Sequence, residues 1–181
     1  MKKFVLLYIA VVMLVVSGCS DSSIGKVQNG VIGFDDSVTV GDALNNYQYF
    51  SEKDWRSYED DQNRTIVEFN GEMDYDKFIG SKYMNMELTA DQVASNKEKI
   101  GDMRVRYVAQ FVLSKSGDTF RTGYSGLTID GAHKDTGEKF EENIPDKNLS
   151  TVKNIYLNNP EIATWGLLYA KENYGKSFFL S

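Results

Sequence analysis

Cysteine, histidine and proline are scarce in this chain of 181 residues, which contains one cysteine, one histidine and two prolines. A single cysteine excludes a disulfide-stapled scaffold, and one cysteine with one histidine excludes a Cys/His zinc site or a multi-histidine metal centre. Two prolines exclude a collagen-like repeat and a proline-rich linker protein. Basic residues are also fewer than acidic ones, with 20 Lys and Arg compared with 26 Asp and Glu. The net charge of −6 disfavours binding to nucleic acid.

The N-terminus has the pattern of an export signal. Lys2 and Lys3 form a positive start, and Phe4–Val16 is an unbroken apolar run of thirteen residues. Such a run is shorter than the roughly 20 residues that span a bilayer, but it has the length of a signal-peptide core. Two other interpretations remain open, an ordinary secretory signal with a chance cysteine and a short membrane anchor.

The apolar run ends at Val16-Ser17-Gly18-Cys19. This motif resembles the lipobox of bacterial lipoproteins, an aliphatic residue and two small residues before a cysteine. The resemblance implies cleavage between Gly18 and Cys19, so that residues 1–18 are a signal peptide. It also implies diacylglycerol on the Cys19 thiol and an acyl chain on the new amino group. Two or three acyl chains suffice for stable membrane attachment.

The residues after the cysteine indicate location and reach. In Gram-negative lipoproteins, which this N-terminus resembles, Asp after the cysteine retains the protein in the inner membrane. Ser20 stands there instead, which favours the outer membrane, facing the periplasm or the surface. Residues 19–30 are predicted to be the lipidated cysteine and a polar tether, reaching roughly 35 Å. After cleavage 18 basic residues face 26 acidic ones, so the mature chain carries −8 and should contact the membrane through its acyl chains alone.

Residues 31–181 are predicted to form one α+β domain. Thr39 is a plausible N-cap for a short helix whose apolar stripe is Val40, Leu44 and Tyr47. Alternating apolar residues and polar turns then predict antiparallel strands. The predicted strands cover residues 55–59, 65–74, 104–114 and 119–124, the last continuing through 127–129, before a long loop or loose hairpin at 130–143.

Further helices are predicted in the second half of this domain. Thr89 and Gln92 form a capping box for a polar helix that stops at Gly101. Residues 150–157 and 159–174 are predicted to be helical as well, the last with Ile162, Trp165, Leu168 and Tyr169 on one face. The expected architecture is a curved antiparallel β-sheet with helices packed on one face. The strand at 104–114 is expected to be central, with both faces covered at its far end.

Several blocks of the mature chain resemble a layout found in bacterial lipoproteins that have no assigned activity. The blocks are Thr-Val-Gly-Asp-Ala-Leu at 39–44, Trp-x-Ser-Tyr at 55–58, Arg-Thr-Ile-Val-Glu-Phe-Asn-Gly at 64–71 and Gln-Phe-Val-Leu at 110–113 before a Gly-Asp turn and Phe120. The resemblance implies no catalytic or cofactor-binding residues.

The residues that could take part in catalysis or bind a metal are the single histidine and several acidic groups, and each is explained by its place in a loop or turn. His133 lies in a polar loop without a Gly-x-Ser-x-Gly nucleophile motif around it, and we expect it to be a loop residue. The acidic groups do not match a calcium-binding EF-hand loop, and Asp side chains stabilise turns by local hydrogen bonds. These groups are Asp35-Asp36, Glu59-Asp60-Asp61, Asp74 with Asp76, and Glu141-Glu142. We therefore predict no metal site, no cofactor and no catalytic residue.

Two other groups of side chains carry alternative interpretations. The aromatic residues near 47–58 and in the hairpin at 107–124 are expected to pack in the core, although tyrosines also suit a binding surface. Arg104, Arg106, Arg121 and Gln110 fall on the opposite strand face. Solvated cross-strand ion pairs are the preferred interpretation, and a small anion site is the alternative.

These features predict a lipid-anchored cell-envelope protein with a non-catalytic binding domain and an envelope protein as partner. An envelope hydrolase that acts on glycan or peptide through loop carboxylates is a second interpretation. A small-ligand carrier is a third, and an apolar pocket of a few hundred Å³ would favour it.

Overall fold

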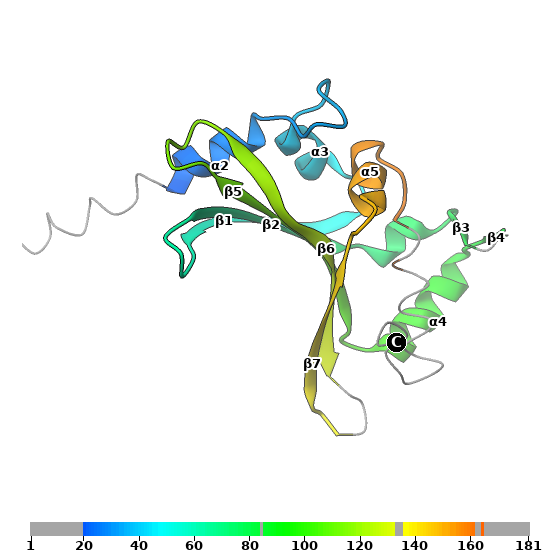
Figure 1. The fold of residues 1–181 in the computed structure, drawn as a ribbon. Helices are drawn as coiled ribbons and strands as arrows, with labels where there is room; N and C mark the ends of the chain where they lie inside the picture. The colour runs from blue at the N-terminus through cyan, green and yellow to red at the C-terminus, as the bar shows by residue number, and fades with distance from the viewer. Residues whose placement is uncertain (1–19, 84, 133–135, 162–163, 165–181) are drawn as a thin grey trace, which may run out of the picture.

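The computed structural model describes residues 20–83, 85–132, 136–161 and 164, and it is built around one antiparallel sheet. The sheet has five strands in the order β1-β2-β5-β6-β7 (Figure 1). Every pairing in this sheet is antiparallel, so the α+β class is confirmed. The strands are β1 (Phe50–Glu59), β2 (Thr65–Met73), β5 (Arg104–Leu113), β6 (Phe120–Ala132) and β7 (Lys139–Pro145).

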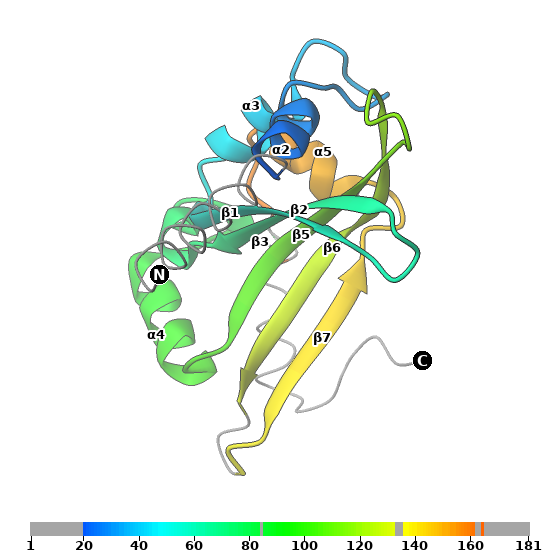
Figure 2. The ribbon, with the colours of Figure 1, turned by 90° about the vertical axis from the view of Figure 1, so that its left-hand side faces the viewer.

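Helices α2 (Ser20–Gln28), α3 (Val40–Asn46) and α5 (Ser150–Tyr156) lie together on one face of the sheet (Figures 1 and 2). Helix α4 (Ala90–Ile100) packs beside the short 3-10 helix η1 (Tyr75–Phe78). A separate two-stranded ribbon joins β3 (Lys82–Tyr83) to β4 (Met86–Glu87). The predicted arrangement, with helices on one face of the sheet, is therefore observed.

The core lies between this sheet face and the helices. In β5 the alternate residues Val105, Tyr107, Ala109 and Phe111 are all buried there, as the period-two pattern of a strand requires. Helix α3 begins after Thr39, whose side chain accepts the Asp42 N–H. The predicted stripe of α3 is buried as well, and its members Val40, Leu44 and Tyr47 pack into the same cluster. Burying each such side chain stabilises the fold by about 1.5–3 kcal/mol.

The predicted strands lie where the structure has strands, but some predicted ranges are too short. Strand β1 begins at Phe50 rather than Trp55, and β6 runs unbroken to Ala132. The segment predicted as a loop or loose hairpin is a hairpin, because β7 pairs with β6 from Gly126↔Pro145 to Ala132↔Lys139. Backbone hydrogen bonds to a neighbouring strand extend these elements, and a polar sequence does not reveal them.

The central position of β5 is confirmed, but one expectation about its faces is wrong. On its polar face Val108 is buried, with 9% of its surface exposed, but it lines an open groove and does not lie under a second layer. Toward the end of the strand Val112 stays partly exposed, opposite the buried Ile66 of β2. The two residues are direct cross-strand neighbours on this face of the sheet.

The predicted capping box of α4 is present. Thr89 accepts the backbone N–H of Gln92 at 3.3 Å, and the Gln92 side chain accepts the backbone N–H of Thr89 at 2.9 Å. Gly101 ends the helix with a φ of +62°, a conformation that favours glycine. Val93 and Ile100 are buried, while most other residues of α4 are exposed, as its polar sequence predicts.

The prediction of an extended tether after Cys19 is wrong for the described part of that segment. Residues Ser20–Gln28 form α2, and Val27 is fully buried in the core. The helix is then tied to α3, since the Val40 N–H donates to the Gly30 carbonyl at 2.8 Å. Ile24 and Val27 are spaced by three and face the core, although their polar neighbours make the segment look like a linker.

Other predictions fall partly or wholly outside the described residues. The helix predicted over 159–174 is one of them, and the signal peptide is another. Among the residues that the structure describes, no helix is both long and apolar enough to cross a membrane.

Candidate functional site

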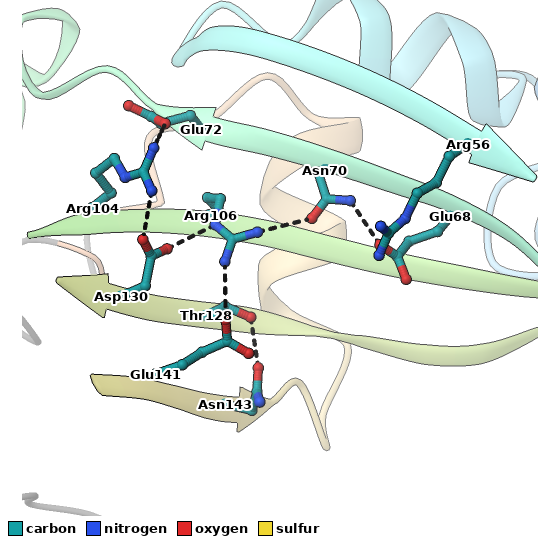
Figure 3. Close-up of polar contacts among 10 residues, drawn as sticks. All are labelled: Arg56, Glu68, Asn70, Glu72, Arg104, Arg106, Thr128, Asp130, Glu141 and Asn143. Carbon is teal, nitrogen blue, oxygen red and sulfur yellow. Dashed lines mark hydrogen bonds and ion pairs between the residues drawn. The ribbon is translucent and has the colours of Figure 1, made fainter. Parts of the chain in front are cut away.

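The sheet face opposite the helices forms an open groove of about 1250 Å³. It is built from alternate residues of all five strands, because every second side chain of a strand points to the same face. Figure 3 shows ten of its polar side chains, which form a nearly continuous hydrogen-bonded array across the sheet. The polar lining residues are Glu52, Lys53, Asp54, Arg56, Glu68, Asn70, Glu72, Arg104, Arg106, Gln110, Tyr124, Thr128, Asp130, Glu141 and Asn143.

Glu68 is the most buried ionisable group of the groove, with its side chain only 5% exposed. Its carboxylate accepts hydrogen bonds from four side chains on three strands. The donors are Arg56 Nη2 at 2.6 Å, Asn70 Nδ2 at 2.8 Å, Gln110 Nε2 at 2.8 Å and Tyr58 Oη at 3.1 Å. A buried charge is tolerated only when it is paired and hydrogen-bonded, and Glu68 meets both conditions.

The ionisation of Glu68 follows from these contacts. Burial on its own raises the pKa of this carboxyl group. The hydrogen bonds from Asn70, Gln110 and Arg56, together with the positive charge of Arg56, outweigh burial and hold the pKa below its ordinary value. Glu68 is therefore a carboxylate at neutral pH.

A second cluster lies toward the other end of the groove, around Asp130 of β6. Arg104 Nη2 and Arg106 Nε each donate to its carboxylate at 2.8 Å. Arg106 also reaches Asn70 Oδ1 and Glu141 Oε2, both at 3.4 Å. Asn70 donates to Glu68 in turn, so it connects the two clusters. The positions of these side chains are thus held by one another.

The charge of the groove is unbalanced toward the acidic side, with six carboxylates against the guanidinium groups of Arg56, Arg104 and Arg106, because the Lys53 ammonium group donates instead to the Asn45 carbonyl of α3 at 2.6 Å. Arg56, Arg104 and Arg106 already pair with carboxylates of the groove. Glu141 is 58% exposed on the edge strand β7. Glu52 and Asp54 are exposed on the opposite edge strand β1. The surplus negative charge therefore lies mainly at the β1 rim, because Glu141 at the β7 rim pairs with Arg106.

Some residues singled out from the sequence meet here and others do not. Arg104, Arg106 and Gln110 line the groove, and the cross-strand ion pair predicted for Arg106 is present. Arg121 is exposed near the start of β6. It pairs with Val112 of β5, which lies six residues along β5 from Arg106. His133, Gly18 and Cys19 lie outside the described residues.

Most of the acidic groups form turns, as predicted. Asp35 accepts the backbone N–H of Ser37, and Asp60 accepts those of Gln62 and Arg64. Asp74 caps η1 by accepting the Asp76 N–H. Glu141 is different, because it belongs to the rim of the groove.

Sequence reasoning missed Glu68, Asn70 and Glu72 as a group. They occupy every second position of β2 and point to the face opposite that of Val67 and Phe69. The strict alternation of polar and apolar residues in this strand was the signal that could have identified them. The partners Asp130 and Asn143 lie on β6 and the unpredicted strand β7, and only strand pairing brings them close.

The helix-covered side of the sheet contains a second, smaller hollow. This apolar pocket has a volume of about 320 Å³ and lies between the 32–34 loop, α3, α5 and strands β5 and β6. The lining residues that carry hydroxyl groups are Tyr107, Thr122, Ser125 and Tyr156. Its size matches the few hundred Å³ expected of a small-ligand carrier.

Comparison with known proteins identifies no relative. No family model, no curated protein and no solved structure matches this chain. The resemblance to lipoproteins without assigned activity therefore stays a prediction. Among the described residues no group of three or more His, Cys, Asp or Glu is placed to hold a metal ion.

Proposed function

We propose that this chain is a lipid-anchored protein of the cell envelope whose domain binds a basic protein partner through the polar groove. The main support for this proposal is the hydrogen-bonded array around Glu68 and Asp130, which lies on the sheet face away from the helices. The lipid anchor at Cys19 and the outer-membrane location belong to the same proposal, and they rest on the lipobox and on Ser20.

A rigid array suits recognition because its polar groups are oriented before the partner arrives. Arg106 is bonded on three sides, and Asn70 is bonded both to Arg106 and to Glu68. Such side chains lose little rotamer freedom on binding, which lowers the entropic cost of the complex.

The charge of the groove indicates the chemistry of the partner. Its arginines are occupied by internal carboxylates. Glu52 and Asp54 offer exposed negative charge at the β1 rim, and Glu141 at the β7 rim stays 58% exposed although it pairs with Arg106. Lys and Arg side chains on a partner complement that pattern and speed the encounter. The net charge of −8 expected for the mature chain acts in the same direction.

The pKa values favour binding over the alternative of glycoside hydrolysis. That reaction needs one carboxylic acid that stays protonated near neutral pH. Among the carboxyl groups of the described residues, Asp35, Asp60 and Glu68 have pKa values that hydrogen bonds hold below the ordinary range. These groups are ionised at neutral pH and are poor proton donors.

Site-specific photocrosslinking in intact cells tests the proposal. A benzoylphenylalanine at Asp54 or at Glu141 should give the same single adduct, because these positions lie on the two rims of one groove. The matched control is Glu87, an exposed acidic residue on β4 away from the groove. An adduct at Glu87 of equal strength contradicts the proposal.

Charge reversal then tests the chemistry of the contact. Glu52→Lys should weaken the Asp54 adduct at least about 5-fold, whereas Glu87→Lys should leave it unchanged. High salt should weaken it as well, since the paired charges lie at exposed rims. A partner that binds equally well to the Glu52→Lys protein is not recognised by this charge.

A further inference from the structure

The apolar pocket has a property that core packing does not explain. Tyr156 lines it, and the Tyr156 hydroxyl is buried without a hydrogen-bond partner among the described residues. A buried hydroxyl without a partner costs roughly 1–3 kcal/mol, so native proteins rarely leave one unmatched. The ring itself is well held, since it meets Phe34 edge-on with centroids 4.9 Å apart.

Neighbouring groups keep this hydroxyl protonated. Burial raises the pKa of Tyr156, and the charge of Asp35 raises it further. Burial also raises the pKa of Tyr107, but the Tyr107 hydroxyl already forms a hydrogen bond with Ser125 Oγ at 3.1 Å. Tyr156 therefore offers a neutral O–H donor at neutral pH.

We infer that this pocket binds one small, largely apolar molecule that carries a neutral oxygen acceptor, and that the Tyr156 hydroxyl donates a hydrogen bond to that oxygen. The apolar wall consists of Ile32, Phe34, Val40, Leu44, Phe111 and Val152. A pocket with such a wall and one or two placed polar groups is the usual form of a small-molecule site. The inference stands apart from the polar groove, which lies on the other face of the sheet.

The volume sets the size of the occupant. At about 30 Å³ for each water-sized group, 320 Å³ holds about ten non-hydrogen atoms. A neutral acceptor is favoured over a carboxylate, because Asp35 is close enough to raise the Tyr156 pKa and would repel a second negative charge.

Two probe molecules that differ by one oxygen atom test the inference. Acetophenone has an aromatic ring and a ketone oxygen, and ethylbenzene lacks the oxygen. Both are titrated against the unlipidated chain from residue 19 to 181 with Cys19→Ser, which carries every described element, and binding is followed by ligand-observed NMR. Acetophenone should bind about 3- to 10-fold more tightly, the usual gain from one hydrogen bond.

Substitutions separate the hydroxyl from the pocket. Tyr156→Phe should abolish the preference for acetophenone and leave ethylbenzene binding unchanged. Tyr124→Phe is the matched control, because its hydroxyl is also buried without a described partner but lies on the polar groove. Thr122→Trp, at an exposed residue that lines the pocket, should weaken both probes at least about 10-fold.

Circular dichroism first shows that each variant is folded, so that a change in probe binding can be assigned to the substituted side chain. Failure of both probes to bind the folded unsubstituted protein overturns the inference. So does a preference for acetophenone that survives Tyr156→Phe, or one that is lost equally in Tyr124→Phe. Because the polar groove takes no part, these results leave the crosslinking test of the proposed function independent.

Discussion

Glu68 and Arg56 form an ion pair between neighbouring strands in which one partner is buried and the other reaches solvent. The Glu68 side chain is 5% exposed, the Arg56 side chain is 61% exposed, and Oε1 and Nη2 lie 2.6 Å apart. Two strand pairings bring Arg56 and Gln110 alongside Glu68 in register, so the backbone geometry of the sheet creates the contact. An ordinary surface ion pair contributes little, but a buried and multiply bonded carboxylate is costly to disturb.

Glu68→Gln should lower the free energy of unfolding by about 1–3 kcal/mol at pH 7, since several donors lose their charged acceptor. The folded pKa of Glu68 lies below its ordinary value, so its stabilisation is present above pH 4.5 and is lost as pH falls through the folded pKa. The difference between the two proteins should therefore shrink below pH 4. Urea unfolding at both pH values measures it.

Glu72→Gln is the control for that measurement. Glu72 lies on the same strand and the same face, but its ion pair is looser, with Arg104 at 3.6 Å and 55% exposed. We expect a loss of about 0.5 kcal/mol or less. Equal losses in the two variants would show that the burial of Glu68 has no special importance.

Gly71→Ala should destabilise the protein by about 1–3 kcal/mol, because a Cβ there would lie 2.7 Å from the ring of the buried Phe50. Gly33→Ala is the control, since a Cβ at Gly33 meets nothing within 4 Å. Thermal unfolding of both variants checks the prediction. A neutral Gly71→Ala would mean that Phe50 does not occupy this place.

Gly25→Pro should destabilise the domain by about 3 kcal/mol, because proline interrupts α2. Gly25→Ala should be neutral or stabilising by up to about 1 kcal/mol, since its surroundings are open. Chemical unfolding of the two variants decides between a packed helix and an extended tether. If neither substitution changes stability, residues 20–28 act as a tether after all.

Cys19→Ala should move the protein from the membrane fraction to the soluble fraction, because the thiol proposed to carry the lipid is lost. Ser20→Ala is the neighbouring control and should leave the protein membrane-bound. Cell fractionation and incorporation of labelled palmitate are the measurements. A Cys19→Ala protein that remains in the membrane removes the basis of the lipid anchor.

Ser20→Asp tests the membrane to which the protein is sent. If Ser20 permits export to the outer membrane, an Asp at this position should retain the protein in the inner membrane. Density-gradient separation of the two membranes reads the result. An unchanged distribution would show that residue 20 does not direct sorting in this chain.

Most of the local structure can be predicted from the sequence because its signals are local, and the N-terminal address, which rests on signals of the same kind, stays a prediction. The Thr39 and Thr89 caps, the Gly101 stop and the alternation in β5 each depend on residues a few positions apart. Side-chain hydrogen bonds and period-two burial act over that range, so one segment is enough to reveal them.

The groove, the apolar pocket and the role of α2 depend on contacts between distant segments. Glu68 meets Gln110 across 42 positions, and Arg106 meets Glu141 across 35. Strand β7 and helix α2 look polar in the sequence, and they become ordered elements because β6 and the core supply their partners. Strand register and burial are properties of the assembled chain, and these long-range contacts therefore emerge only when the sheet has formed.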